Sequence, residues 1–283
     1  MQPLPESRST TYLKRPFEYP AESKLGELIS RGQEWDAVLG PIIQALVAGP
    51  APFMCEVGSN IGSSTRQLLK AAPGAQMLCF EPSNRFRSFL ERNLFLAGHS
   101  AEVLPYIVGK EAGVAVIHSN ETSGTVLPAP HLPTAQESPM VRLDDVLEGR
   151  PPLDFLKVDT DGFDFEVLLG AEQTIRRDRP VIFFEYAPSF YANGEGVSGL
   201  RQLQAMGYRR LHLLDPAGKY LLTTQDAEEA HARSTRHQHG TYCDILACAS
   251  GSPAELRQRT LLPLRPGRMP TVARRGPLGW FRR

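Results

Sequence analysis

The feature that most constrains this chain is an apolar segment that runs directly into a glycine loop. Residues 52–57 predict a buried parallel strand, and the loop that follows reads G-S-N-I-G over 58–62. Its two glycines permit a sharp turn beneath a ligand before serines open a helix. A second apolar run, 77–80, ends in Glu81. Because neighbouring parallel strands end side by side, Glu81 can accept hydrogen bonds from both hydroxyls of a ribose, which predicts an adenosine-binding site.

The loop also discriminates among adenosine cofactors. A dinucleotide fingerprint requires glycine where this chain has Asn60, and no Gly-Lys-Ser/Thr follows as in a Walker loop. We expect Glu56, two residues before Gly58, to face the ligand, where a carboxylate repels a pyrophosphate and attracts a cation. S-adenosylmethionine has an ammonium and a sulfonium but no phosphate, so this methyl donor is favoured over NAD or ATP. The alternative is a glycine-containing turn in some other α/β domain.

Five segments together resemble the FkbM family of S-adenosylmethionine-dependent methyltransferases. They are EVGSNIG at 56–62, FEPSN at 80–84, LDD at 143–145, LKVDTDG at 156–162, and 165–170. The resemblance extends over residues 19–249 and implies a seven-stranded class I methyltransferase fold and O-methylation of a sugar or polyketide hydroxyl. The family's usual Asp-Val-Glu-Gly-x-Glu reads D-T-D-G-F-D here, over 159–164. Aspartates stand in place of both glutamates, so the side chains keep their charge but reach less far. This difference affects the predicted identity of the substrate more than that of the cofactor.

Composition suits one large domain with extensions. The 283 residues, 41% of them hydrophobic, can bury one substantial core. We expect a segment and helix packed on the sheet over 1–50, the methyltransferase domain over 51–250, and a basic, disordered tail over 251–283. The tail holds eight arginines against a single acid, Glu255, so its alternative role is contact with an anionic membrane surface, nucleic acid or a partner. The chain carries no strong nucleic-acid signal.

The sequence contains no membrane-spanning run and no cysteine spacing typical of a metal site. No run of 18 apolar residues occurs and residues 1–20 lack the apolar core of a targeting signal, so we expect a cytoplasmic protein with no transmembrane segment. The four cysteines, at 55, 79, 243 and 248, fall in predicted strands without metal-ligand spacing. We therefore expect reduced core cysteines and no metal.

Alternating apolar runs predict an α/β, Rossmann-like, doubly wound sheet that is mostly parallel, with an antiparallel closing strand. The remaining expected strands are 103–108, 114–118, 153–158 and 181–184, with 209–214 and 242–249 as the closing pair. The expected helices are 35–47, bent by Pro41, then 63–70, 86–97, 164–176 and 200–206. The Ser/Thr/Pro-rich segment 119–139 is expected to be a loop that serves as a substrate lid.

Ligands of such sheets bind at the carboxyl ends of the strands, where the strand order reverses. The expected cofactor contacts are Glu56, Gly58, Ser59, Asn60, Gly62, Glu81 and Pro82. The expected catalytic residues are Asp159, Asp161 and Glu185, on the acceptor side together with Tyr186. An alcohol must lose its proton to react, and Asp159 is our first candidate for the base, although it could instead hold the ammonium of the cofactor. Further candidates are His237 and His239. Lys157 is expected to point off the opposite strand face into a salt bridge, without a chemical role.

Two rival functions come from other classes. The segment D-T-D at 159–161 also resembles the D-x-D metal site of a nucleotide-sugar glycosyltransferase, where two carboxylates hold Mn²⁺ or Mg²⁺ against a diphosphate. That reading leaves the glycine loop unexplained. The other rival is a non-catalytic methyltransferase-like scaffold, against which the intact set of Gly58, Gly62 and Glu81 argues. The expected partner is a small-molecule or glycan acceptor that the sequence does not specify further.

Overall fold

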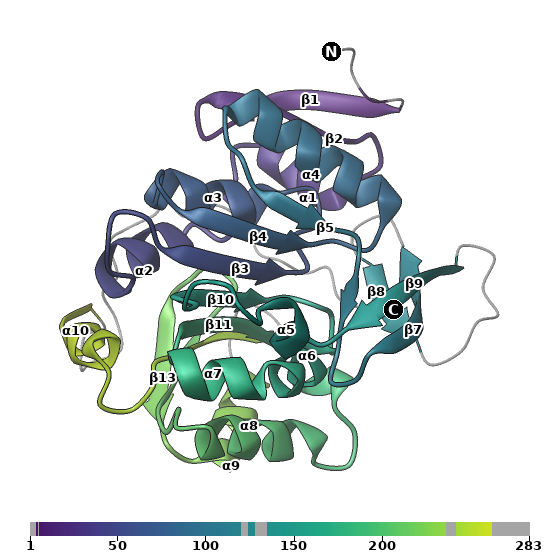
Figure 1. Ribbon diagram of the computed structural model, residues 1–283. Helices are drawn as coiled ribbons and strands as arrows, with labels where there is room; N and C mark the ends of the chain where they lie inside the picture. The colour runs from purple at the N-terminus through teal and green to yellow at the C-terminus, as the bar shows by residue number, and fades with distance from the viewer. Residues whose placement is uncertain (1–3, 5, 120–123, 128–134, 236–241, 262–283) are drawn as a thin grey trace.

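A computed structural model describes residues 4, 6–119, 124–127, 135–235 and 242–261. Its centre is an eight-stranded sheet with the order β13-β12-β14-β11-β10-β3-β4-β5 (Figure 1). The strands are β3 Phe53–Val57, β4 Gln76–Phe80, β5 Glu102–Leu104, β10 Phe155–Val158, β11 Val181–Tyr186, β12 Leu211–Leu214, β13 Tyr220–Thr224 and β14 Cys243–Ala247. From β11 to β5 all neighbours are parallel, whereas β14 and β13 are antiparallel to the strands beside them. The class I methyltransferase arrangement is confirmed, including the closing pair β12 and β14, and β13 is one strand more than expected.

Helices cover both faces of the sheet, because successive side chains of a strand point to opposite faces. Met54 of β3 belongs to the core of one face, while the next residue, Cys55, belongs to the core of the other. The first face is covered by α2 Leu39–Leu46, α3 Ser63–Ala71, α4 Asn84–Ala97 and α10 Pro253–Leu261. The second is covered by α5 Leu143–Val146, α6 Asp164–Gly170, α7 Glu172–Asp178, α8 Glu195–Ala205 and α9 Ala227–Ser234. All four cysteines are buried and free, as expected.

A second sheet, of four strands, lies beside the carboxyl ends of the first (Figure 1). It has the order β6-β9-β7-β8, with β6 Ile107–Val108, β7 Gly113–Ser119, β8 Gly124–Leu127 and β9 Ala135–Val141. The prediction of one strand over 103–108 is therefore wrong. The segment divides at Pro105, which has no N–H to donate to a ladder, and its two halves join different sheets. The expected loop 119–139 is also wrong in part, because it contributes β8 and most of β9. Residues 120–123 and 128–134 lie outside the described residues.

The N-terminal segment forms a hairpin that the sequence did not predict. Strands β1 (Ser7–Tyr12) and β2 (Arg15–Pro20) pair, and α1 (Lys24–Ser30) packs beside them. Buried Arg66 of α3 donates to the carbonyl oxygens of Tyr12 and Pro16, at 2.7 and 2.8 Å, and thereby ties the hairpin to the main domain. A buried guanidinium needs such acceptors, so the hairpin is fixed in position.

Two expected helices have different bounds. The helix over 35–47 begins only at Leu39, so Pro41 lies in its first turn, where a missing N–H costs nothing and no bend results. The expected helix over 164–176 is divided into α6 and α7 at Gly170. A Cβ at Gly170 would lie 2.0 Å from the carbonyl oxygen of Gly109, so glycine permits the close approach of α6 to β6.

The predicted tail 251–283 starts with a docked helix, contrary to the expectation of a disordered tail. Helix α10 lies beside α2 (Figure 1), and Ala254 belongs to the core of that face. Arg257 donates to the carbonyl oxygens of Ala45 and Leu46, at 3.1 and 2.7 Å, near the C-terminal end of α2. Residues 262–283 lie outside the described residues.

We expect two truncations to behave differently. Removal of 253–283 eliminates both Arg257 hydrogen bonds, each worth about 1.5 to 3 kcal/mol, whereas removal of 262–283 retains them. The midpoint of urea unfolding should therefore be lower for the shorter protein. Equal midpoints for the two truncations would contradict a stabilising role of α10.

Candidate functional site

The glycine loop brings the ends of β3 and β10 into contact. Gly58 has φ +85°, and a Cβ at this position would lie 1.9 Å from the carbonyl oxygen of Asp159. Gly62 also has φ +85°, and a Cβ there would lie 2.8 Å from Cδ1 of Leu90. Between them, Asn60 has φ +49°, a left-handed conformation that asparagine tolerates. The loop therefore requires glycine for its shape as well as for ligand access.

Glu81 joins this loop to the end of β4. Its Oε2 accepts a hydrogen bond from the backbone N–H of Asn60 at 2.8 Å, and its Oε1 accepts one from that of Ser83 at 2.9 Å. The side chain is 5% exposed, and burial raises the pKa of Glu81 to about 7 against the opposing effect of these hydrogen bonds. A carboxylate oxygen has two acceptor positions, so each oxygen can accept a further hydrogen bond from a ribose hydroxyl.

One cavity brings three of the seven predicted cofactor residues and one expected catalytic acid together, whereas Glu56, Ser59, Asn60 and Gly62 do not line it. Gly58, Glu81, Pro82 and Asp159 all line it. Its other walls are mainly apolar or aromatic: Val57, Phe80, Tyr106, Ile107, Val108, Ile117, Thr160 and Phe163. Apolar walls with a few polar groups are typical of a small-molecule site.

Glu56 does not line this cavity, contrary to expectation. Its carboxylate is fully buried, at 0% exposed, and accepts hydrogen bonds from the hydroxyls of Ser64 and Thr65 in the first turn of α3. Buried Ser59 donates its hydroxyl to the backbone oxygen of Glu56, at 3.4 Å. Glu56 therefore stabilises the loop and the start of α3, where a negative charge is favourable.

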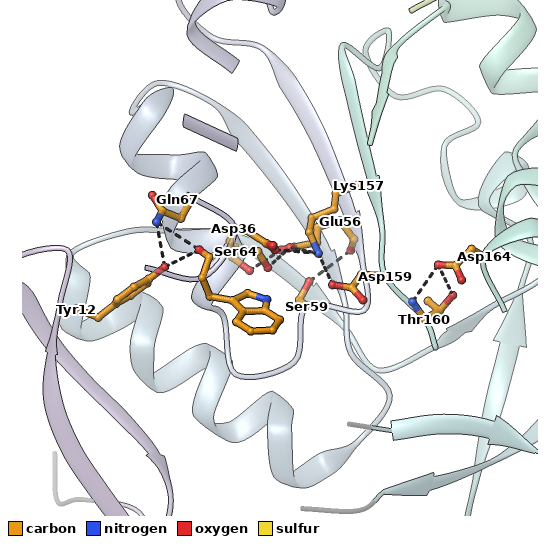
Figure 2. Close-up of polar contacts among 12 residues, drawn as sticks. Tyr12, Asp36, Glu56, Ser59, Ser64, Gln67, Lys157, Asp159, Thr160 and Asp164 are labelled. Carbon is orange, nitrogen blue, oxygen red and sulfur yellow. Dashed lines mark hydrogen bonds and ion pairs between the residues drawn. The ribbon is translucent and has the colours of Figure 1, made fainter. Parts of the chain in front are cut away.

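Lys157 forms the expected salt bridge, but it lies on the other strand face from the one expected. Its Nζ lies 2.8 Å from Oδ2 of Asp159, 3.6 Å from Oδ2 of Asp36 and 3.7 Å from Oε1 of Glu56 (Figure 2). The expected opposite orientation is wrong, because residues 157 and 159 are two positions apart in an extended segment and share a face. Although burial lowers the pKa of Lys157, the three carboxylates raise it well above the ordinary value, so the ammonium stays charged.

Asp36 reaches this cluster from the turn before α2 and was not predicted. It has φ +52°, and its Oδ2 is buried without a hydrogen-bond partner, although the Lys157 charge is near. Burial raises the pKa of Asp36 to about 6, with Lys157 opposing the shift. The carbonyl of the preceding Trp35 accepts hydrogen bonds from the Tyr12 hydroxyl at 3.0 Å and from Gln67 Nε2 at 3.4 Å (Figure 2). The N-terminal hairpin and Gln67 thus hold the turn that places Asp36 beside Lys157.

Asp164 holds the loop between β10 and α6 together. It is the second position at which aspartate replaces the usual glutamate of the family motif. Its carboxylate, 1% exposed, accepts from the backbone N–H and the hydroxyl of Thr160 and from the N–H of Gly162, each at 3.1 Å. The hydroxyl of Tyr191 donates to it at 3.2 Å. Burial, and secondarily the Asp159 charge, raises the pKa of Asp164 to about 7. Asp161 occupies the turn of this loop with φ +50°.

Two residues expected on the acceptor side, Glu185 and Tyr186, come from the end of β11, and Tyr186 does not lie as predicted. Half-buried Glu185 lies near the carboxyl end of β11, and its pKa is raised well above the ordinary value by burial and then by Asp159 and Asp161. Tyr186 points to the other face of the sheet from Glu185 and is fully buried in the core there. Its hydroxyl lies 2.7 Å from Nδ1 of His231. Its placement on the acceptor side is therefore wrong. The two candidate bases His237 and His239 lie outside the described residues.

Among the described residues, no group of three His, Cys, Asp or Glu side chains is arranged to hold a metal ion. In the same part of the chain, no helix combines the length and the apolar composition that crossing a membrane requires.

The chain is similar in sequence to known methyltransferases. Residues 56–210, more than half of the chain, match the family described as "Methyltransferase FkbM domain". The "2-O-methyltransferase NoeI" of Sinorhizobium fredii (strain NBRC 101917 / NGR234) is 26% identical over 172 residues, which cover 54% of this chain and 70% of the relative.

Two solved structures are also similar. Methyltransferase FkbM from Methylobacillus flagellatus KT has a TM-score of 0.46 and 15% identity over 70% of this chain, and the match spans only 44% of that longer chain. The O-methyltransferase from Bacillus cereus, in complex with SAH, has a TM-score of 0.43 and 15% identity, with 75% of this chain and 79% of that chain covered.

The family match argues against the glycosyltransferase function, because the matched residues include the glycine loop, Glu81 and the D-x-D segment together. Three observations support the same assignment: the family match, the strand order of the main sheet, and the cavity lined by Gly58 and Glu81. The chain belongs to the FkbM family of S-adenosylmethionine-dependent methyltransferases.

Proposed function

We propose that this protein methylates a hydroxyl group of a sugar, a glycolipid or a polyketide-type acceptor. The observation that carries the proposal is the shared cavity, in which Gly58 and Glu81 meet Asp159 at the carboxyl ends of β3, β4 and β10. An oxygen acceptor is also favoured by the similarity to NoeI, whose name describes a 2-O-methyltransferase.

The residues present fit the cofactor. S-adenosylmethionine supplies an electrophilic methyl group on a sulfonium when it is bound. Glu81 would accept hydrogen bonds from its ribose, and Pro82 and Phe80 would contact the adenine. Because Glu56 is turned away, the half-exposed Asp159 is the nearest carboxylate for the ammonium. The carboxylates near the cavity still disfavour a pyrophosphate, so NAD and UDP-sugars are poor candidates.

Of the three expected catalytic acids, Glu185 is the one whose side chain makes no hydrogen bond or ion pair with another described residue. Burial and then neighbouring carboxylates raise the pKa of Glu185 above its ordinary value, which favours proton uptake. Asp159 is engaged by Lys157 at 2.8 Å, and Asp161 lies in a tight turn. We therefore assign proton acceptance to Glu185, while Asp159 and Asp161 orient the cofactor and the acceptor.

Incubation with labelled S-adenosylmethionine and a panel of sugars and cell extracts tests the function, with the product identified by mass spectrometry. We expect a methyl ether. A product methylated on nitrogen or carbon would overturn the O-directed assignment. Calorimetry adds a test of the cofactor site, in which S-adenosylmethionine and its demethylated product bind and NAD does not.

Glu81→Ala should weaken cofactor binding at least tenfold. The variant loses two charge-assisted hydrogen bonds, worth about 1.5 to 3 kcal/mol each before water compensates, and it frees the N–H groups of Asn60 and Ser83. Calorimetry with S-adenosylmethionine measures the loss, and Glu91→Ala, a change at an exposed position of α4, is the matched control. Wild-type affinity in Glu81→Ala would show that Glu81 is not the ribose anchor.

A further inference from the structure

Phe190 is an exposed aromatic residue at the carboxyl-end edge of the main sheet. Its side chain is 47% exposed and belongs to the 3-10 turn η1 (Pro188–Phe190), which follows β11 and the Glu185 carboxylate near the end of that strand. A single exposed apolar side chain is common on a protein surface and needs no functional reason. The surroundings of this ring distinguish it from such a residue.

Gly162 brings Phe190 against the loop that follows β10. Gly162 comes directly after Asp161 and has φ +95°, and a Cβ there would lie 2.6 Å from Cβ and 2.7 Å from Cγ of Phe190. These distances are too short for real atoms, so glycine permits the close approach of the Phe190 side chain to the loop. Two further residues of the same loop, Thr160 and Phe163, line the cofactor cavity. Phe190 therefore lies beside that cavity, on the acceptor side.

The residues on both sides of Phe190 are anchored. Pro188 is buried. The ring of Tyr191 stacks on that of Tyr186, with 5.6 Å between the centroids, and the Tyr191 hydroxyl donates to Asp164 at 3.2 Å. The exposed ring is thus held in place from both ends of the turn. A ligand that covers a fixed aromatic surface has little side-chain entropy to overcome.

An aromatic ring beside carboxylates matches the chemistry of a pyranose. One face of a pyranose consists mainly of C–H groups, which pack on the electron-rich face of an aromatic ring, and its hydroxyls donate hydrogen bonds to carboxylates. Asp161 precedes the glycine that Phe190 contacts, and Glu185 lies near the end of the strand that leads into η1. An open-chain polyol has the hydroxyls but no rigid C–H face.

We propose that Phe190 contacts the C–H face of a pyranose ring and thereby selects a saccharide as the methyl acceptor. The proposal rests on the function proposed above and narrows its acceptors to a pyranose, either free or part of a larger glycoconjugate. Phe190 takes no part in proton or methyl transfer. It orients the pyranose so that a hydroxyl at the edge of the ring faces the carboxylates at the ends of β10 and β11.

Saturation-transfer NMR tests this contact without methyl transfer. The full chain is deuterated except for its phenylalanine and tyrosine ring protons and is saturated with the demethylated cofactor. The probes are methyl β-glucopyranoside, methyl β-galactopyranoside and methyl α-mannopyranoside, with sorbitol as the open-chain comparison. We expect saturation to reach the C–H protons of at least one pyranoside but not those of sorbitol.

Substitutions then assign the contact to this ring. Phe190→Ala should reduce the transfer and weaken pyranoside binding by about two- to tenfold, whereas Phe190→Tyr should retain both. Phe95→Ala, at a ring that is 61% exposed on α4, is the matched control and should behave as the wild type does. If Phe190→Ala fails to fold, Phe190→Leu takes its place, because leucine keeps an apolar contact with Gly162 but has no ring.

Three results would overturn the proposal. They are the absence of transfer to every pyranoside in the wild type, wild-type pyranoside affinity in the variant without the ring, and an equal loss of cofactor affinity in that variant, which would mean that the ring only supports the loop. The proposed function fails separately. A pyranoside that contacts Phe190 without being methylated would contradict the function alone, whereas methylation of a non-sugar hydroxyl at the wild-type rate in Phe190→Ala would contradict the role of Phe190 alone.

Discussion

Glu185→Gln is expected to lower the rate of methyl transfer by about 10²- to 10⁴-fold with unchanged cofactor affinity. Glutamine keeps the size and polarity of the side chain but cannot take up the proton of the acceptor. The half-buried side chain of Glu185 makes no hydrogen bond with other described residues, so the substitution removes little structural support. Single-turnover assays with labelled S-adenosylmethionine measure the rate, and calorimetry measures the affinity.

Asp159→Asn is the matched comparison. We expect it to affect cofactor affinity more than the chemical step, because Asp159 lines the cavity with Gly58 and Glu81. If Asp159→Asn instead slowed turnover with unchanged affinity, and Glu185→Gln turned over as the wild type does, the base would be Asp159. Unchanged turnover in both variants would direct attention to His237 and His239.

The cofactor side of the site was predictable because its signals are local. The turn at Gly58 needs a positive φ, which favours glycine, and the distance along the chain from β3 to Glu81 is that of one strand-helix-strand unit. Local apolar periodicity also predicted the parallel core and the closing pair. Such features depend on residues close in sequence, so one chain is enough to predict them.

Asp36 and Phe190 could not be found in this way. Asp36 reaches Lys157 only because the hairpin and Gln67 hold the preceding turn, and no periodicity predicts that contact. Phe190 meets the loop after β10 through packing between the segments that follow β10 and β11, and the sequence specifies neither the turn η1 nor this contact. The orientations of Lys157 and Tyr186, by contrast, follow from the period of two in a strand, and its strict application would have predicted both.

Lys157→Met should destabilise the fold by about 3 to 5 kcal/mol, because the variant leaves buried carboxylates without their counter-charge. Lys157 is 2% exposed, and its ammonium lies within 4 Å of Asp36, Glu56 and Asp159. Methionine fills nearly the same volume, so loss of packing contributes little. Urea unfolding at neutral pH measures the change, with Lys110→Met as the exposed control.

A second substitution separates charge from packing. If the uncompensated Glu56 carboxylate causes the loss, Glu56→Gln combined with Lys157→Met should recover part of the stability, because glutamine still accepts a hydroxyl hydrogen bond but carries no charge. A double variant as unstable as the sum of the single changes would place the loss in packing. Wild-type stability of Lys157→Met itself would mean that the carboxylates are neutral in the folded protein, and the ion cluster would then have no role in holding β3, β10 and the Asp36 turn together.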